Sequence, residues 1–389
     1  MITINLYINN YYYNVKIEIL KENLKAGLDV IEKVVSKNLS LPILNNVLIS
    51  TEDSFLNLVS TNLETTIKFW VLSKIIKEGR VVIPIKIFSS FVASLPNEKI
   101  LIEAKGHNLY VECKNFKTQI QGFNPEDFPI IPEFKSNGSL NIESRKFCQG
   151  LSQVIDIPIE SQIRPEISGI YFNFSKNNLK FVSTDSFRLA EKNMQVETLD
   201  LKEGSFIIPQ KPVRDVASIL DGKDGLVYLN FSTNQVLFDF PMKELKHSQV
   251  QVISRLIEGE YPNYQEIIPE KFKTTVVLKK DEFLSQVKTA SLFSGRINEV
   301  KVLINPTKKE VEIFSRSSDI GENKSSIQAQ IKGDPIEVSF NYKYLADGLL
   351  NIKSSEIIFE ISKEEGACIL RPVGDSSYIY VVMPIKALS

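Results

Sequence analysis

One pattern of elements occurs three times along this 389-residue chain, with a period of roughly 130 residues. Each copy opens with apolar residues three and four positions apart, the spacing of one helix face. These residues are Leu24, Leu28, Ile31 and Val35 in the first copy, Phe147, Leu151 and Val154 in the second, and Phe283, Val287 and Ala290 in the third. The repeat restricts the fold to three versions of one unit, each long enough to bury a core of its own.

The elements that follow the first helix also recur in order. Alternating, β-branched runs predict a strand, and two further strands flank a polar turn. A fourth element begins as a strand and continues as a helix, with Pro84 and Pro209 at the change in the first two copies. The three sets of ranges are 42–50, 56–69 and 79–95; 165–174, 179–192 and 204–220; and 298–305, 311–326 and 335–350. Similar closing segments, GFNPEDFPIIP and GEYPNYQEIIP, end the first two copies at 122–132 and 259–269.

This order predicts an α+β fold of three repeated domains, each with two helices packed on antiparallel sheets. We expect the domains to span residues 1–137, 138–273 and 274–389. The connections at 133–139 and 270–274 are short and polar, so the domains should pack against each other.

Composition and motifs exclude several classes of protein. Neither His107 nor His247 belongs to a metal-binding spacing, and no phosphate loop, dinucleotide turn or nucleophile elbow occurs. We therefore expect no metal, no cofactor and no catalytic residue. The odd cysteine count predicts reduced thiols at Cys113, Cys148 and Cys368. Together with the lack of a signal peptide or a membrane-spanning run, this predicts a cytoplasmic protein without a membrane partner.

Positive charge is concentrated on the predicted helices. The six helical segments sum to +7 in a chain whose net charge is −1, so a shared basic face could meet the phosphates of a nucleic acid without reading bases. A solvated helix surface is the alternative interpretation. The basic residues involved are Lys21, Lys25, Lys33, Lys37, Arg145, Lys146, Lys211, Arg214, Lys279, Lys280, Lys288 and Arg296.

Motifs in order along residues 14–389 resemble the bacterial DNA polymerase III β subunit family, the replication sliding clamps. They include SLPILNNVLIS, STNLET, NPEDFPIIP, ISGIYFNF, STDSFRLA, GEYPNYQEIIP and YVVMPI. The resemblance implies a head-to-tail homodimer whose six domains form a ring around double-stranded DNA. It also implies a processivity factor without chemistry of its own, which binds the polymerase III α subunit, the clamp loader complex and other proteins carrying clamp-binding motifs.

The resemblance further assigns roles to individual residues. A pocket for partner peptides between the second and third domains would use Ile167, Thr184, Ser186, Phe187, Arg188, Leu189, Pro262, Ile267, Val381 and Met383. Additional DNA contacts would come from Lys37, Asn38, Gln162 and Arg164. The dimer interface would join an edge strand around Thr118 and Ile120 to the helix end at Ser291, Leu292 and Phe293.

Some features depart from the family or allow another interpretation. Ser186, Phe187 and Glu266 replace residues common in the family, which predicts a different peptide preference, and residues 1–13 have no counterpart in it. A carboxylate pair such as Glu64 and Asp185 could serve an enzyme, and a β-rich repeat protein could also be a peptide- or carbohydrate-binding scaffold. Loss of turnover on Glu64→Gln or Asp185→Asn would identify the enzyme, whereas retention on circular but not linear DNA would identify the clamp.

Overall fold

A computed structural model describes residues 14–35, 41–196 and 203–385. The N-terminal extension 1–13 therefore lies outside the described residues. The chain divides into two compact units, Met1–Arg145 with Arg214–Leu256, and Lys146–Val213 with Ile257–Ser389. The middle predicted domain is thus shared between the two units, and the domain limits at 137 and 273 stay a prediction.

The first repeat contains the elements expected from its pattern. Two α-helices and nine strands are present among the described residues, with short 3₁₀ turns between them. The helices are α2 (Lys21–Ile31) and α3 (Ile85–Ser94). The strands are β1 (Lys16–Leu20), β2 (Asn46–Glu52), β3 (Phe55–Thr61), β4 (Thr65–Leu72), β5 (Lys74–Lys77), β6 (Arg80–Pro84), β7 (Lys99–Lys105), β8 (Asn108–Cys113) and β9 (Phe116–Gln121). The 3₁₀ turns are η1 (Glu32–Val34), η2 (Pro42–Asn45) and η3 (Pro125–Asp127).

The second repeat has the same order. Its helices are α4 (Ser144–Ser152) and α5 (Gln210–Leu220). Its strands are β10 (Gly138–Glu143), β11 (Gly169–Ser175), β12 (Asn178–Thr184), β13 (Arg188–Gln195), β14 (Gly204–Pro209), β15 (Leu226–Phe231), β16 (Gln235–Pro241) and β17 (Ser248–Arg255). Its 3₁₀ turns are η4 (Pro165–Ile167) and η5 (Tyr264–Ile267).

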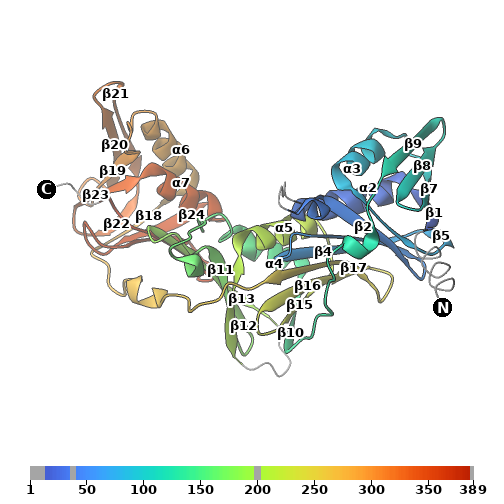
Figure 1. Cartoon of the computed structure of the whole chain (residues 1–389). Helices are drawn as coiled ribbons and strands as arrows, with labels where there is room; N and C mark the ends of the chain where they lie inside the picture. Colours follow the sequence, from blue (N-terminus) through green and yellow to red (C-terminus); the bar gives the residue numbers. More distant parts are fainter. Residues whose placement is uncertain (1–13, 36–40, 197–202, 386–389) are drawn as a thin grey trace. The chain divides into compact units, whose positions relative to one another are not determined.

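The third repeat ends at the last described strand. Its helices are α6 (Lys280–Ser291) and α7 (Tyr342–Asn351), which pack side by side (Figure 1). Its strands are β18 (Thr274–Lys279), β19 (Glu299–Asn305), β20 (Glu310–Ser317), β21 (Gly321–Gln328), β22 (Gln330–Gly333), β23 (Ile336–Asn341), β24 (Glu356–Ile361), β25 (Cys368–Pro372) and β26 (Tyr378–Val382).

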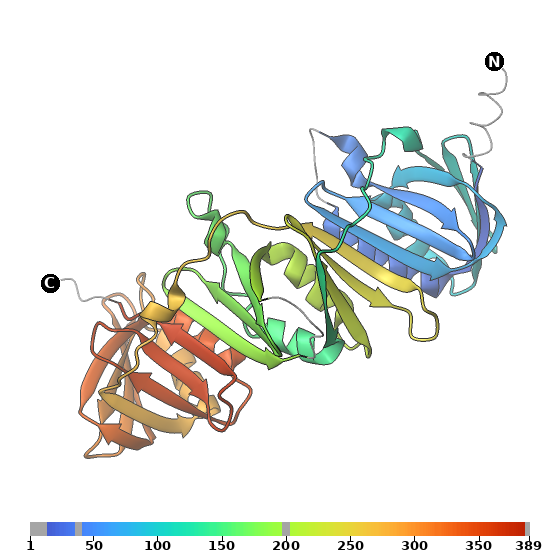
Figure 2. The same cartoon turned by 90° about the horizontal axis from the view of Figure 1, so that it is seen from below.

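Two antiparallel sheets build the first unit. One has the strand order β5-β1-β7-β8-β9, and the other has the order β10-β15-β16-β17-β4-β3-β2-β6. In the larger sheet, β17 of the second repeat pairs with β4 of the first, with Val252 opposite Ile67. Figure 2 shows this arrangement as a yellow strand beside the blue ones. One continuous sheet therefore joins the first repeat to part of the second.

The second unit repeats this construction. Its larger sheet has the order β14-β11-β12-β13-β26-β25-β24-β18-β22, and its smaller sheet has the order β21-β20-β19-β23. Here β26, the last strand of the third repeat, pairs with β13 of the second, with Leu189 opposite Val381. Both junctions between repeats are thus made by the same kind of strand pairing.

The helix faces expected from the apolar spacing are buried. Leu24, Leu28 and Ile31 are fully buried on α2, and α3 and α5 begin directly after Pro84 and Pro209, as predicted. The expectation for Val35 is wrong, because Val34 is the buried residue and Val35 is only half-buried. The α-helix ends at Ile31 and continues as the 3₁₀ turn η1, which has fewer residues per turn and rotates the next side chains.

The remaining sequence expectations concern thiols and membranes. No disulfide joins the three cysteines; Cys113 and Cys368 are buried, and Cys148 is half-buried. Burial raises the pKa of the Cys368 thiol to about 12, so this group stays protonated and unreactive. Within the described ranges, no helix is both long and apolar enough to cross a membrane.

Candidate functional site

The predicted partner pocket is organised by the tight turn between β12 and β13. Ser183 Oγ donates to the Val154 carbonyl at 2.6 Å, and Thr184 Oγ1 donates to the Arg188 carbonyl at 2.8 Å. Asp185 Oδ1 accepts hydrogen bonds from the Phe187 and Arg188 amides, each at 3.0 Å. These short polar side chains form hydrogen bonds with backbone groups of the turn that have no partner in the sheet, and they thereby fix the path of the turn.

Ser186 occupies the left-handed region of this turn, with φ of +76°. A residue with a Cβ is strained there. The Ser186 amide donates to Thr184 Oγ1 at 3.1 Å, which helps to hold the conformation. This hydrogen bond therefore stabilises the turn with a serine at the left-handed position.

Arg188 connects the turn to helix α7. Its Nε lies 2.9 Å from Asp185 Oδ2, its Nη1 pairs with Asp347, and its guanidinium carbon lies 4.8 Å from the ring centroid of Tyr344. Burial disfavours the charge, but interactions with Tyr380, Asp347 and Asp185 outweigh it and raise the pKa of Arg188 above its ordinary value. The guanidinium is thus a permanent cation that ties together groups distant in sequence.

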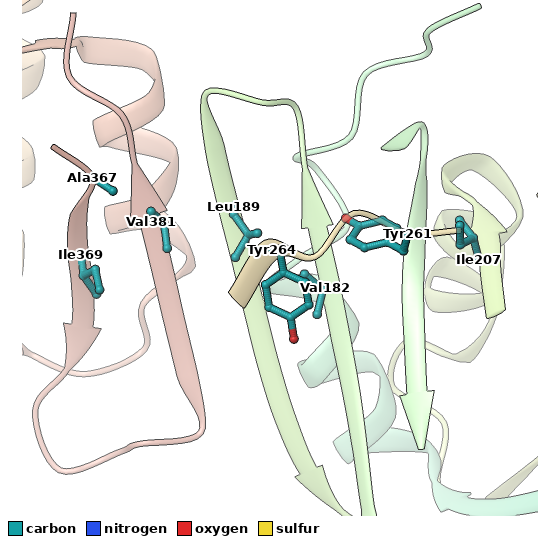
Figure 3. Packing of buried hydrophobic residues seen from close by; sticks show 8 residues of the cluster. All are labelled: Val182, Leu189, Ile207, Tyr261, Tyr264, Ala367, Ile369 and Val381. Carbon is teal, nitrogen blue, oxygen red and sulfur yellow. The ribbon is translucent and has the colours of Figure 1, made fainter. Parts of the chain in front are cut away.

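An apolar cluster lies beside this turn and is shown in Figure 3. It joins the β12–β13 hairpin, the closing segment at 259–269 and the two C-terminal strands. Met383 packs against the cluster, and its amide donates to the Phe187 carbonyl at 2.8 Å. The buried members are Val182, Leu189, Ile207, Tyr261, Tyr264, Ala367, Ile369 and Val381. The second unit therefore gathers side chains from far apart in the sequence.

Several of the predicted pocket residues come together here. The β13–β26 pairing brings Leu189 next to Val381, and Phe187 is 58% exposed with its ring stacked near Tyr344. Ile167 is buried in η4, and Ile267 is half-exposed at 48%. The structure thus brings Leu189, Val381 and Met383 into one apolar cluster, and Phe187 and Ile267 expose apolar surface of the kind that a peptide anchor could contact.

Thr184 and Arg188 also make hydrogen bonds inside the protein. These bonds hold the turn in place, and the part of both residues in peptide binding stays a prediction. Asp185 is similarly occupied, since both of its carboxylate oxygens accept hydrogen bonds from the turn, and such a carboxylate is poorly suited to acid–base catalysis.

Sequence reasoning missed four residues of the site. Tyr344 and Asp347 come from α7, and Tyr261 and Tyr264 come from the closing segment. The only signal for the tyrosines was the YPNY motif itself, whose first and last residues flank the predicted Pro262. Nothing in the helical pattern around Asp347 indicated that it would meet Arg188.

The predicted DNA-binding residues of the first repeat make local contacts. Lys21 Nζ donates to the Ala93 and Leu95 carbonyls at 3.1 and 2.5 Å, at the end of α3. Lys25 pairs with Asp29 one turn away. Lys33 lies beyond the α-helix, in η1, and donates to Ser218 Oγ at 2.9 Å. Lys37 and Asn38 lie outside the described residues.

In the second repeat, Arg145 forms an ion pair with Asp224 at 2.5 Å. Lys146 precedes the buried Phe147 on α4, and Lys211 and Arg214 lie on α5. Gln162 and Arg164 are exposed in the loop before β11. The Arg164 guanidinium lies 3.1 Å from Glu166 and 3.3 Å from Ser186 Oγ, so this loop contacts the pocket turn.

In the third repeat, Lys279 pairs with Glu282 at 2.9 Å, and Lys280 donates to the Ile352 carbonyl at 3.2 Å. Lys288 lies in the last turn of α6, and Arg296 follows that helix. Exposed ion pairs of this kind are weak, so they can be exchanged for phosphate contacts. The assignment of all these residues to DNA binding stays a prediction.

The predicted dimer residues occupy an edge strand and a helix end. β9, with Thr118 and Ile120, is an edge of its sheet. Ile120 is buried within its own unit, so a partner at this edge would meet the backbone rather than this side chain. Ser291 is the last residue of α6, Leu292 is 68% exposed and Phe293 is half-buried.

The fold and site together define a protein of the repeated-domain clamp class. Comparisons with known proteins agree with that class along almost the whole chain. Residues 15–132, 141–263 and 265–386 match, in order, the N-terminal, central and C-terminal domains of the DNA polymerase III beta subunit. The chain belongs to the DNA polymerase III beta subunit family.

Individual relatives give the same result. The chain is 26% identical over 383 residues to the beta sliding clamp of Bacillus subtilis, covering 95% of this chain and 99% of the relative. The crystal structure of the Bacillus subtilis DNA polymerase sliding clamp matches with a TM-score of 0.91 and 25% identity, over 96% of this chain and 100% of that one. The beta subunit from Thermotoga maritima matches with a TM-score of 0.88 and 26% identity, over 96% and 99%.

Family membership decides between the alternatives raised by the sequence. Proteins of this family are sliding clamps of DNA replication, which encircle DNA and tether the polymerase. They act as processivity factors and are not catalytic by themselves. The two alternative hypotheses, a carboxylate-dependent enzyme and a binding scaffold without a role on DNA, are therefore not supported.

Proposed function

We propose that two copies of this chain close head to tail into a ring around duplex DNA, which holds the replicative polymerase on its template. The observation that carries this proposal is the repeated strand pairing at the junctions. β17 pairs with β4, and β26 pairs with β13. In each case the last strand of one repeat pairs with the strand that comes after the polar turn of the repeat before it.

Within the part of the chain that the structure describes, two strands in the corresponding positions have no partner from another repeat. β21 comes after the polar turn of the third repeat, and β9 is the last strand of the first. Each is an edge of its sheet among the described residues. Edge strands present backbone groups that can pair with another chain. Pairing β21 of one copy with β9 of a second copy, in both directions, would close a ring.

Apolar groups accompany these edges. Leu292 is 68% exposed directly after α6, and that helix contacts β21, where Gln286 Nε2 donates to the Ser326 carbonyl at 3.0 Å. Phe116 is 46% exposed at the start of β9. Exposed apolar side chains flanking an open edge support a buried contact between copies.

The solution mass tests ring closure. Two chains of 44.1 kDa should give 88.2 kDa by light scattering. Leu292→Asp should shift the mass towards the monomer, because a carboxylate would be buried without a partner. Ile76→Asp is a matched control, since Ile76 is 47% exposed on β5 at the opposite edge of the sheet containing β9. A monomer for the unchanged protein at micromolar concentration, or equal effects of the two variants, would contradict the proposed interface.

Retention on DNA tests encirclement. After loading, the protein should stay on circular duplex and run off linear duplex, while equilibrium binding should be weak and strongly dependent on salt. The predicted basic residues on and beside helices α2, α4, α5 and α6 support phosphate contacts without sequence preference. Equal retention on both DNA forms would contradict a topological link.

The proposal extends to domains, partners and location. Three domains spanning 1–137, 138–273 and 274–389 would each supply one repeat of the ring. The predicted pocket beside Leu189 and Val381 would receive short, partly apolar segments of the polymerase, the clamp loader and other partners, because the side chains gathered there are apolar. We place the protein in the cytoplasm, where bacterial replication takes place.

A further inference from the structure

Glu191 is a buried carboxylate beside the apolar cluster of the second unit. It lies on β13 and is 8% exposed. Its Oε2 accepts a hydrogen bond from the Tyr264 hydroxyl at 2.5 Å and lies 3.3 Å from Lys180 Nζ. Its Oε1 accepts a hydrogen bond from Asn193 Nδ2 at 3.0 Å. A buried charge is tolerated only when it is paired and hydrogen-bonded, and both oxygens of this carboxylate meet that requirement.

Tyr264 connects the carboxylate to the closing segment at 259–269. It is the first residue of η5, and Ile267, a predicted pocket residue, is the last. The Tyr264 ring belongs to the apolar cluster, and Figure 3 shows it beside Val182. Burial, and then the hydrogen bond to Glu191, raise the pKa of the Tyr264 hydroxyl, so this group keeps its proton and donates it to the carboxylate. Glu191 therefore fixes the point at which η5 begins.

The closing segment of the first repeat is buried through a different side chain. There Phe128 belongs to one buried cluster with Val59. Lys68 lies opposite Val59 in the β3–β4 pairing, at the place that Glu191 takes opposite Val182 in the β12–β13 pairing. A phenylalanine ring offers no hydroxyl group to a neighbour. Burial of a closing segment therefore does not require a tyrosine and a carboxylate, which indicates a further role for this pair in the second unit.

The two kinds of contact constrain the chain differently. Apolar packing is non-directional, so it buries a ring without fixing how the ring is turned. A hydrogen bond weakens steeply when its distance or angle changes. The contact between Tyr264 and Glu191 therefore restricts the position of η5 more than burial alone does. Ile267, in the same short turn, is 48% exposed, so the restriction also applies to a side chain that a partner could contact.

We propose that Glu191 is a positioning residue of the predicted pocket: through Tyr264 it holds η5 in the place where the exposed Ile267 side chain meets the apolar anchor of a partner peptide. This inference rests on the proposed function, because it needs that pocket to bind peptides. It gives the buried network a role in partner binding in addition to its role in folding.

Peptide affinity tests the positioning role. A labelled peptide with a phenylalanine anchor is titrated into the full-length protein and its variants. Glu191→Ala should weaken binding about five- to tenfold, because η5 loses its fixed position. Glu191→Gln keeps an oxygen that can accept the Tyr264 hydrogen bond, although without the charge, and should weaken binding by no more than about twofold. Tyr264→Phe removes the same hydrogen bond while the ion pair of Glu191 with Lys180 stays, and should weaken binding about fivefold.

A matched control separates positioning from general loss of stability. Glu360 is 16% exposed on β24 of the same sheet and pairs with Arg371 at 3.1 Å. Glu360→Ala should lower the midpoint of urea unfolding, as Glu191→Ala does, because each change leaves a cation without its carboxylate. Only Glu191→Ala should change peptide affinity.

Double variants locate the effect on η5. In an Ile267→Ala protein the side chain that η5 presents is gone, so adding Glu191→Ala should weaken binding by less than about twofold. In a Phe187→Ala protein, which loses a contact on the β12–β13 turn instead, the full five- to tenfold effect of about the same size should remain.

The possible outcomes separate this inference from the proposed function. Unchanged affinity in Glu191→Ala and Tyr264→Phe, an equal loss in Glu360→Ala, or a full effect in the Ile267→Ala protein would overturn the positioning role while leaving the pocket intact. Failure of the unchanged protein to bind the peptide would overturn the pocket, and the role of Glu191 with it.

Discussion

The polar turns of the first and second repeats are built from the same hydrogen bonds. Ser60 donates to the carbonyl of Ile31, the last residue of α2, and Ser183 donates to that of Val154, two residues after α4, each at 2.6 Å. Thr61 and Thr184 each donate to the carbonyl four residues on, at 3.1 and 2.8 Å. Both turns also contain a residue with positive φ. The shared sequence pattern therefore fixes a shared backbone.

The two turns differ in the residue that begins the next strand. In the first, this residue is Thr65, and the neighbouring Thr66 hydroxyl lies 2.9 Å from that of Thr61. In the second, Arg188 takes the place of Thr65 and reaches Asp185 and Asp347. The turn of the first repeat is thus stabilised by threonine hydroxyl groups, whereas the turn of the second repeat contacts helix α7 through the buried charge of Arg188. Only the second turn adjoins the predicted pocket.

Removing that charge should have the largest effect. Arg188→Ala leaves the Asp185 carboxylate buried without its cation, which should cost about 3–5 kcal/mol in the second unit. Thr65→Ala should cost about 1 kcal/mol or less. Urea unfolding combined with hydrogen exchange at 183–192 and 60–72 measures both. Similar losses in the two variants would mean that Arg188 contributes no more than a hydroxyl does.

The exposed ring of the second turn should matter for partners. Phe187→Ala should weaken an apolar-anchor peptide about tenfold, about 1.4 kcal/mol, because an aromatic contact is lost at the pocket. Glu64→Ala, at the matching position of the first turn, should have no effect on the same titration. If both changes weaken peptide binding, the second turn is not the only one that contacts the peptide, and the prediction is wrong.

The serines should contribute equally. Ser60→Ala and Ser183→Ala each remove a buried hydroxyl donor to a carbonyl, that of Ile31 at the end of α2 in one case and that of Val154 just after α4 in the other. Each should cost about 1–2 kcal/mol. Unfolding of the two single variants under one set of conditions provides the comparison. A difference larger than about 1 kcal/mol would show that the shared hydrogen bond is not energetically equivalent in the two repeats.

The smallest effects should come from the positions with positive φ. Leu63 has φ of +75° and Ser186 has φ of +76°. Glycine at either position relieves backbone strain, so Leu63→Gly and Ser186→Gly should each stabilise the protein by about 0.5–1 kcal/mol. The melting temperature of each variant checks this, and a decrease would mean that the side chain contributes more than its strain costs.

The sequence predicted the features that depend on local order. The three-copy pattern, the buried helix faces and the change from strand to helix at Pro84 and Pro209 follow from periodicity and from the fixed geometry of proline. The apolar pattern did not predict that the α-helix ends at Ile31, because Val34 and Val35 are both apolar and either could face the core. The 3₁₀ turn rotates the side chains after Ile31, so that Val34 is buried in place of Val35.

The site was predicted only in part. Resemblance identified the turn residues and the C-terminal strand, which pair directly. Tyr344 and Asp347 lie more than 150 residues from Arg188, and no spacing rule connects side chains over that distance. Similarly, the sequence did not predict the contacts of Lys21 with the Ala93 carbonyl and of Lys25 with Asp29, since a helix pattern shows where a lysine lies but not which group its side chain reaches.

The sheet that runs through each junction has a practical consequence for dissecting the protein. β4 carries the buried residues Ile67, Phe69 and Trp70 and lies between β3 and β17. A fragment cut at the predicted domain limit of 137 would lose β17 and leave this apolar strand open to pairing with other molecules. Such a fragment should aggregate or swap strands, whereas a fragment that also carries residues 214–256 keeps the edge covered. The sequence repeat is therefore a poor guide to where this chain can be cut.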